Sequence, residues 1–316
     1  MGAAKPRIRW KEAVTRFITE AQIDKKASIK NDQDALRWLD DYFQDHGLHG
    51  IYLDEFTPKL VSEIITARRT PYVLIYPSGQ TRRCEPGPDT VNRFLTTLRA
   101  MLIKSRDEWD WVDKIPKIPA LPNTTERIRW ITKQEAEALV YELPAHLASM
   151  CEFSLQTGLR RANVTHLKWS QVDLPRRTAW VLSEDTKNGK SLGVPLSAQA
   201  VKILEKQKNS QIKKPSEWVF PRSGKPVHQT STKAWRDALK RAGIEDFCWH
   251  DLRHTWASWH VQSGTPLHVL QELGGWSSIK MVQKYAHLSS EHLRAWVDKS
   301  PGVRLVVDND NTGTKG

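Results

Sequence analysis

Three prolines at intervals of three residues, Pro116, Pro119 and Pro122, divide the chain into two parts. Proline fixes its own backbone torsion and lacks an amide donor, so no helix continues through this segment, and the spacing favours an extended, stiff connector. A chain of 316 residues is also long enough for two domains. We therefore predict a first domain over 1–111, a linker over 112–124, a second domain over 125–300 and a tail over 301–316.

The net charge lies mostly in the second part of the chain. Residues 1–112 carry 18 basic and 16 acidic side chains, whereas residues 113–316 carry 30 and 20, which gives the second part +10 of the total of +12. A basic excess of this size favours a polyanionic partner, nucleic acid before a membrane surface. The composition excludes collagen-like, disulfide-framework and wholly disordered chains.

The expected location of the protein is the cytoplasm. No apolar run reaches the roughly 18 residues that a membrane span needs, and the first residues lack the apolar core of a signal peptide. The three cysteines, Cys84, Cys151 and Cys248, are odd in number and widely spaced. They are typical of reduced thiols, not of a metal site or a set of disulfides.

The first part has the apolar spacing of helices. Apolar residues recur at helical intervals within 10–18 and 36–43, a third helix is predicted to begin after Thr57-Pro58, and a fourth follows Asp89. Between the last two, residues 70–87 contain three prolines, two glycines and the pair Arg82-Arg83. This composition predicts a loop, either solvated or in contact with DNA.

The second part mixes helices and strands. The capping box Thr132-Lys-Gln-Glu135 predicts a helix start, and a second helix is expected to end at Gly158. Residues 178–183 and 191–196 flank Asn188-Gly189 and predict a β-hairpin. Further helices are predicted at 198–209, 231–242, 250–262, 266–273, 278–287 and 289–298, and a short strand at 303–307.

Four segments of the second part carry groups suited to binding a phosphodiester. Arg160 follows the predicted helix end, and Lys187 lies in the hairpin turn. His250 and Arg253 are three residues apart on a helix, so they can bind one phosphate together. Tyr285 completes the set. Each residue alone is weak support, because a surface arginine, a solvated lysine and a core tyrosine are common.

His250 and His254, four residues apart on a helix, also allow a zinc interpretation. The general-base Glu of the HExxH motif is absent, and Arg253 between them would repel a cation. We therefore expect no metal site here.

Together, these segments resemble those of the tyrosine recombinase (phage integrase) family in their order along the chain and in their sequence motifs. The matching segments are Thr157-Gly-Leu-Arg160, Thr186-Lys187, His250-Asp-Leu-Arg253-His254-Thr255, Leu273-Gly-Gly-Trp276 and Tyr285-Ala-His287. The resemblance covers about residues 124–290 and extends more loosely to the first part. It implies a mainly α fold with a small β-hairpin or sheet: a helical, SAM-like core-DNA-binding domain followed by a mixed α+β catalytic domain.

The resemblance also implies a mechanism. Tyr285 attacks the scissile phosphate and forms a 3′-phosphotyrosine, although an isolated tyrosine, with a pKa of about 10, is a poor nucleophile at neutral pH. Arg160 and Arg253 neutralise the non-bridging oxygens. Lys187 protonates the departing 5′ oxygen, and His250 assists proton transfer or binds the phosphate. The covalent bond conserves the energy of the cleaved one, so no metal or nucleotide cofactor is implied.

Three further positions carry weaker implications. Trp276 lies where many relatives have His, and its indole N–H can donate a hydrogen bond but cannot shuttle a proton. His287 is assigned a supporting or structural role. Asn163 replaces the Glu or Asp that is common three residues after the first arginine, so it can orient a neighbour without contributing charge.

The implied partners are duplex DNA recombination sites and three further copies of the chain, which form a homo-tetramer on DNA. An accessory DNA-bending or directionality protein is left open, and no membrane partner is expected. Residues 303–307 are apolar enough to dock on a sheet edge, in the same protomer or in a neighbour.

The preferred interpretation is the integrase of a phage or another mobile element, which integrates or excises it. A chromosome-dimer resolvase or an invertase would use the same chemistry, and a type IB topoisomerase shares the residue set. A non-catalytic DNA-binding regulator on the same fold is the alternative from a different class.

Overall fold

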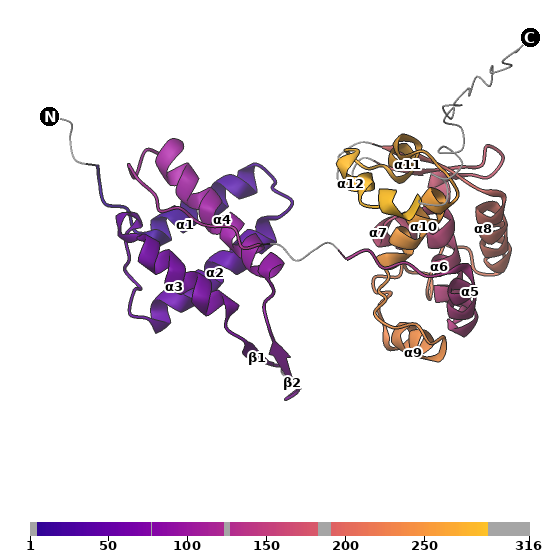
Figure 1. Ribbon diagram of the computed structural model, residues 1–316, viewed down its shortest axis with the longest axis horizontal. Helices are drawn as coiled ribbons and strands as arrows, with labels where there is room; N and C mark the ends of the chain where they lie inside the picture. Colours follow the sequence, from indigo (N-terminus) through magenta and orange to yellow (C-terminus); the bar gives the residue numbers. More distant parts are fainter. Residues whose placement is uncertain (1–4, 77, 123–126, 183–190, 290–316) are drawn as a thin grey trace, which may run out of the picture. The chain divides into compact units, whose positions relative to one another are not determined.

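The computed structural model describes residues 5–76, 78–122, 127–182 and 191–289. The chain forms two compact units, Met1–Glu126 and Arg127–Gly316, which are described separately (Figure 1). Over the described residues each unit is mainly helical with one small antiparallel sheet, which confirms the predicted fold class. Lys187 with its predicted turn, the helix expected beyond Ser289 and the strand at 303–307 lie outside the described residues.

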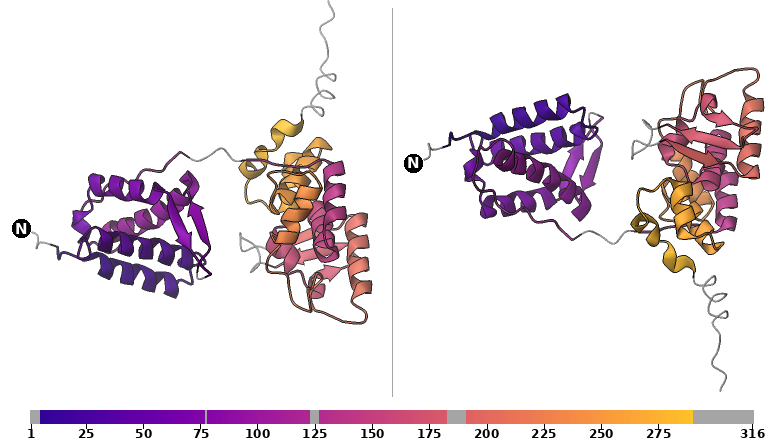
Figure 2. Two further views of the ribbon diagram at one scale, coloured as in Figure 1. Left: turned by 90° about the horizontal axis from the view of Figure 1, so that it is seen from below. Right: turned by 90° about the horizontal axis from the view of Figure 1, so that it is seen from above.

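The first unit is built around the helices α1 (Trp10–Ile23), α2 (Ile29–Asp45), α3 (Pro58–Arg69) and α4 (Pro88–Asp107), with a short 3₁₀ helix at Leu53–Glu55. The helix α3 begins where the sequence predicts it. Pro58 occupies its first position, and the Thr57 hydroxyl accepts a hydrogen bond from the Leu60 amide at 3.2 Å. The helix α4 packs on α1, α2 and α3, and α1 also packs on α2; Figure 2 shows these helices gathered together. Their buried apolar side chains form one core.

The loop predicted over 70–87 is wrong in part, because this segment contains a β-hairpin. The strands β1 (Tyr72–Ile75) and β2 (Thr81–Cys84) pair antiparallel, with Val73 opposite Arg83. The aromatic and β-branched residues of β1 favour the extended conformation, and this preference overrides the loop composition around them.

The proline-rich segment packs along the first unit up to Pro122. It contains neither helix nor strand, and its Ile118 is buried in the core of that unit. The Asn92 side chain, on α4, donates to the Leu121 carbonyl at 2.8 Å and accepts from the Leu121 amide at 2.7 Å. Arg99 donates to the Ile118 carbonyl at 2.9 Å. These bonds fasten the extended segment to α4.

The second unit places two helices at its centre and others around them. Its elements are α5 (Lys133–Glu142), α6 (Ala145–Thr157), α7 (Arg161–Thr165), β3 (Val172–Asp173), β4 (Thr178–Val181), β5 (Leu192–Pro195), α8 (Ala198–Ser210), α9 (Lys233–Arg241), α10 (Asp251–Gln262), α11 (Leu267–Gly274) and α12 (Lys280–Gln283), with 3₁₀ helices at Trp169–Gln171 and Ala286–Ser289. The helices α6 and α10 pack against each other, and α5 and α8 pack on α6 (Figure 1).

The predicted local signals of the second unit are confirmed at three points. Thr132 and Glu135 form the reciprocal capping box that begins α5. The strands β4 and β5 form the predicted hairpin, with Ala179 opposite Val194. The helix α6 ends at Gly158, which has a left-handed backbone with φ of +62°.

The helix predicted over 278–287 is wrong, because α12 covers four residues only. A turn follows it, in which the Tyr285 amide donates to the Val282 carbonyl at 2.9 Å, and the chain then continues into the 3₁₀ helix Ala286–Ser289. The side-chain periodicity of this segment was that of a helix, but the backbone turns just before Tyr285. Among the described helices, none has the length and apolarity that crossing a membrane requires.

Candidate active site

Arg253 lies at the centre of the candidate site, in the first turn of α10. It is 5% exposed. Its guanidinium donates to the carbonyl of Gly158, at the end of α6, and to the carbonyl of Gly274, at the end of α11, each at 2.6 Å. The same group stacks over the Trp276 ring at 4.0 Å. One arginine therefore connects the ends of two helices with the start of a third.

Glycine is required at both carbonyl positions because indole rings pack directly over the backbone. A Cβ at Gly158 would overlap the Trp256 ring, and a Cβ at Gly274 would overlap the Trp276 ring. The two indoles stack with centroids 6.0 Å apart. The Thr-Gly-Leu-Arg and Leu-Gly-Gly-Trp segments are thus distant in sequence but belong to one packed arrangement.

Arg160 supplies the second guanidinium of the site. It follows the left-handed Gly158 closely and occupies the N-cap position of α7, half-buried. Its charge lowers the pKa of Arg253 and also that of His250, which places all three groups within one electrostatic neighbourhood. The sequence prediction that these residues meet is consistent with this arrangement.

Burial, and then the Arg160 charge, lower the pKa of Arg253 to about 9, with Tyr285 acting in the opposite direction. The group therefore remains charged at neutral pH. Two cations held this close repel each other, and a bound anion relieves that repulsion. The arrangement is that of a site for phosphate or a similar anion.

His250 occupies the N-cap position of α10, where its side chain makes no capping hydrogen bond, and it is partly open to solvent. Burial of the rest of the ring, and then the charge of Arg253, lower its pKa, with Lys284 and Arg160 adding to the effect and Asp251 opposing it. The imidazole is therefore neutral at pH 7, and it can accept a proton. A phosphate bound beside it would raise the pKa again.

Tyr285 is 1% exposed, and its hydroxyl lies 2.6 Å from Nδ1 of His254. Its ring also packs near Trp276, with centroids 6.2 Å apart. The phenol therefore lies inside the second unit, next to the indole that covers Arg253. A phosphodiester cannot reach this oxygen unless the turn after α12 moves.

Sequence reasoning missed two contributors to the site. It named His254 in a matching segment and as a zinc candidate but gave it no part in the reaction, whereas Nδ1 of this residue contacts the phenol. The rings of His254 and His250 are 5.2 Å apart. It gave Asp251 no role. This buried carboxylate accepts from the Cys248 amide at 2.8 Å and from Arg127 at 3.1 Å, and it so fixes the first turn of α10.

The remaining predicted residues lie as follows. Trp276 is buried in contact with Arg253, as described above. Asn163 is buried in α7, and His287 is exposed in the 3₁₀ helix after Tyr285. Lys187 lies outside the described residues.

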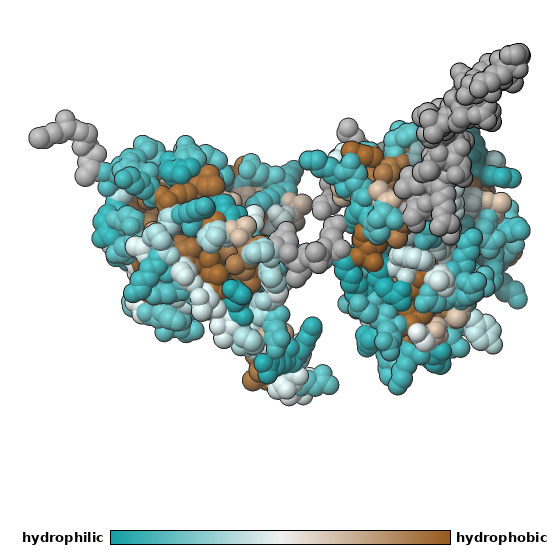
Figure 3. Space-filling view, in the orientation of Figure 1, coloured by the Kyte–Doolittle hydropathy of each residue, from teal (hydrophilic) through white to brown (hydrophobic). Residues whose placement is uncertain are grey.

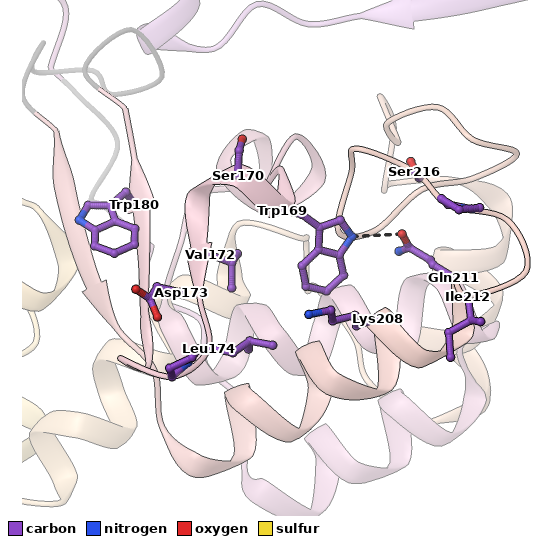
Figure 4. A pocket seen from close by; sticks show the side chains of 12 residues that line it. Trp169, Ser170, Val172, Asp173, Leu174, Trp180, Lys208, Gln211, Ile212 and Ser216 are labelled. Atoms are coloured by element: carbon purple, nitrogen blue, oxygen red, sulfur yellow. Dashed lines mark hydrogen bonds between the residues drawn. The ribbon is translucent and has the colours of Figure 1, made fainter.

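A separate pocket of about 670 Å³ opens on the second unit. Trp169, Trp180, Leu174 and Ile212 contribute its apolar walls (Figure 4). At one side, Trp169 Nε1 donates to the Gln211 side chain at 3.1 Å. The described residues gathered around Arg253 are not part of its lining, so this pocket is distinct from the candidate site.

A buried arginine fork, a second guanidinium, an imidazole and a phenol belong to the same part of the second unit. The chain belongs to the phage integrase family, because the profile described as "Phage integrase family" matches residues 129–292.

Individual proteins are similar to the chain in sequence or in fold. The chain is 44% identical, over 212 residues, to the integrase of Salmonella phage P22; the match covers 63% of this chain and 54% of that protein, so the chain spans about half the length of this relative. A lambda integrase dimer bound to a COC′ core site shares the fold with a TM-score of 0.66 at 16% identity, covering 96% of this chain and 81% of that one. The Tn1549 transposon integrase in complex with transposon right-end DNA gives a TM-score of 0.68 at 14% identity, covering 90% and 99%.

Proposed function

We propose that the chain is a site-specific DNA recombinase that cuts and rejoins duplex DNA through a 3′-phosphotyrosine, and that it integrates and excises a phage or another mobile element. The observation that supports this most strongly is the position of Tyr285. Its buried phenol packs near Trp276, and the ring of that tryptophan also covers the Arg253 guanidinium. The relative in phage P22, which is called an integrase, supports the biological role.

In the proposed reaction the Tyr285 oxygen attacks the scissile phosphorus as the bond to the 5′ oxygen breaks. Arg160 and Arg253 stabilise the charge that builds on the non-bridging oxygens, where fixed donors contribute most. The phenol proton passes to the imidazole of His250, whose lowered pKa keeps it unprotonated at neutral pH. The 5′ oxygen takes a proton from Lys187 and leaves as a hydroxyl. A 5′ hydroxyl from another strand reverses these steps and rejoins the DNA.

Release of the nucleophile is a step of its own in this proposal. The hydrogen bond to His254 holds the phenol in its buried position, and the turn between α12 and the 3₁₀ helix shifts to deliver it to the phosphate. Trp276 stays over Arg253 and supports the guanidinium, and its N–H is available as a donor. Asn163 and His287 have supporting roles only.

The proposed substrate is a pair of duplex DNA sites, bound by a homo-tetramer with an accessory DNA-bending or directionality protein as a further partner. The net charge of +12 supports a polyanionic substrate. The apolar run at 303–307 is proposed to dock on a sheet edge of the same or a neighbouring protomer. Deletion of residues 300–316 is then expected to impair recombination more than binding to a single site.

The test is formation of a covalent adduct. A duplex enriched from a random library by repeated binding to the chain supplies the half-site, and a nick next to the cleavage position lets the short 5′-hydroxyl strand diffuse away. The wild type is expected to give a protein–DNA band on a denaturing gel, which Tyr285→Phe loses and the control Tyr141→Phe, at an exposed tyrosine of α5, keeps. Binding without any adduct would instead favour the non-catalytic regulator.

A further inference from the structure

The hairpin β1–β2 projects from the first unit with an apolar strand that the described residues of this unit leave exposed (Figures 1 and 3). Val73, Leu74 and Ile75 are all exposed, and Ile75 is 75% exposed. An uncovered run of large apolar residues on a two-stranded ribbon is a marker of a binding surface. Its position on a projecting ribbon means that an occupant can approach it from both faces.

The ribbon and the end of α3 before it carry basic as well as apolar side chains. Residues 68–84 include the arginines Arg68, Arg69, Arg82 and Arg83 and no acidic residue, and Glu85 is the first acidic residue to follow. Arg68 is partly used inside the unit, where its guanidinium stacks over Trp38 at 5.1 Å. Arg82 and Arg83 lie on the exposed strand β2.

The exposed apolar side chains and the arginines together indicate which partner binds the ribbon: a nucleic acid, not a second copy of the chain. A second copy carries the same net charge of +12 and would be repelled by the ribbon. Duplex DNA offers phosphates to the arginines and thymine methyl groups to the apolar side chains. Charge complementarity therefore commits the ribbon to DNA.

The geometry of the ribbon fits the major groove. A single sheet with side chains on both faces is about 10 Å thick, and the major groove is about 12 Å wide, whereas the minor groove is only about 6 Å wide. Successive residues of a strand point to opposite faces, so Arg82 and Arg83 point to opposite sides. Leu74 is paired with Arg82 and Val73 with Arg83, so each face combines an apolar side chain with one arginine.

We propose that the β1–β2 ribbon enters the major groove of the duplex DNA substrate, with Arg82 and Arg83 on phosphates of the two opposite walls and Val73 and Ile75 against thymine methyl groups. This proposal rests on the proposed function in that the substrate is duplex DNA. It assigns to the ribbon a contact that lies outside the catalytic centre.

The first test is the salt dependence of binding to the duplex enriched from a random library, measured by fluorescence anisotropy. Each phosphate contact contributes about 0.9 to the slope of log K against log salt, so Arg82→Ala/Arg83→Ala is expected to reduce the slope by about 2 and to weaken binding about 30-fold at 0.15 M salt. The matched control is Arg37→Ala/Lys59→Ala on α2 and α3. Arg37 and Arg83 have side chains that are 70% and 73% exposed, and each pairs with a neighbouring carboxylate.

The second test is a cross-link in the groove, made with cytosines that carry a thiol tether on N4. In a Cys84→Ser/Cys248→Ser background, Ile75→Cys is expected to form a disulfide with the tethered base. Ile23→Cys is the matched control, since Ile23, at the end of α1, is 74% exposed. A slope equal to that of the control, or cross-linking no better than that of Ile23→Cys, would overturn the proposal.

Failure of the ribbon proposal is distinguishable from failure of the proposed function. Adduct formation by the wild-type chain reports the chemistry, whereas the salt dependence of binding in Arg82→Ala/Arg83→Ala, compared with its control, reports the ribbon contact. A wild-type chain that binds DNA through the ribbon but forms no adduct would contradict the recombinase assignment alone. A wild-type chain that forms the adduct, with binding indifferent to the ribbon arginines, would contradict the ribbon proposal alone.

Discussion

At the scale of single residues, Arg253 is the central group of the candidate site. Its buried guanidinium connects α10 with the ends of α6 and α11, and it has further N–H groups that a ligand can use. Its two carbonyl partners and the Trp276 ring fix its position before any substrate arrives. Such fixed charge is the main source of transition-state stabilisation when charge develops on phosphate oxygens.

Replacing this group by another cation is expected to fail. In Arg253→Lys the ammonium cannot bond both carbonyls and stack on Trp276 in the same geometry. We expect adduct formation to fall by about a hundredfold or more, which is typical for loss of one transition-state donor. Arg161→Lys, at the exposed neighbour of Arg160, is the control and is expected to keep its rate, measured in single turnover. A rate within threefold of the wild type in Arg253→Lys would contradict this role.

The glycine at 158 is expected to matter for packing as well as for backbone conformation. Gly158→Ala places a Cβ in the Trp256 ring and strains a left-handed position, so we expect unfolding to require about 3 kcal/mol less. Gly243→Ala is the matched control, because Gly243 has a φ of +68° and open space around it. It should cost only about 1 kcal/mol. Equal losses in urea unfolding would show that the indole contact has no effect.

At the scale of elements, local sequence signals predicted where several helices begin and end. They did not predict the turn at Tyr285 or the hairpin β1–β2. The Thr132 capping box, the Thr57-Pro58 start and the Gly158 stop each depend on neighbouring residues only, so the sequence predicts them. The turn at Tyr285 was missed because its apolar residues have helical spacing, and packing on α10 set the backbone instead. The hairpin β1–β2 was missed because proline and glycine composition outweighed a short strand signal.

The candidate site could be predicted residue by residue but not in its geometry. The segments around Arg160, His250, Arg253 and Tyr285 have sequence motifs that resemble those of a known family. The expectation that these residues form one site followed from this resemblance. The contact between His254 and the phenol could not be predicted, because it depends on where the turn after α12 folds back. The indoles that cover the glycines also contact them only through the tertiary fold.

The hydrogen bonds between the proline-rich segment and α4 are expected to stabilise the first unit. Asn92→Ala removes both side-chain bonds to the Leu121 backbone. We expect the first unit to lose about 1–3 kcal/mol of stability and the segment 112–122 to become sensitive to limited proteolysis. Thr96→Ala on the exposed side of α4 is the control, since its hydroxyl bonds only within the helix. Unchanged cleavage in Asn92→Ala would mean that apolar packing alone holds the segment.

At the scale of the whole molecule, charge and protonation set the conditions for activity. The second part of the chain holds +10 of the net charge of +12, so its attraction to DNA is expected to weaken steeply with salt. Burial lowers the pKa of His146, His250 and His260, all in the second unit. The unfolded chain therefore binds more protons than the folded one once the pH falls below the ordinary histidine pKa.

This difference predicts a pH-dependent melting temperature. The histidine contribution is fully present above pH 6.5, the ordinary pKa, and is lost as the pH falls below that value. Carboxylates with lowered pKa, such as Glu135 and Asp237, act only below their ordinary values of 4.5 and 3.8. Calorimetry should show the melting temperature falling between pH 7 and 5.5, less so in His260→Gln. A flat profile over this range would contradict the burial of the three rings.

The most direct measurement is the identity of the residue joined to DNA. The covalent adduct is digested with protease and nuclease, and the linked peptide is sequenced by mass spectrometry. We expect a 3′-nucleotide phosphate on the oxygen of Tyr285 and on no other side chain. A phosphate on a different tyrosine, such as the exposed Tyr141, or a DNA cleavage product that carries no peptide, would contradict it.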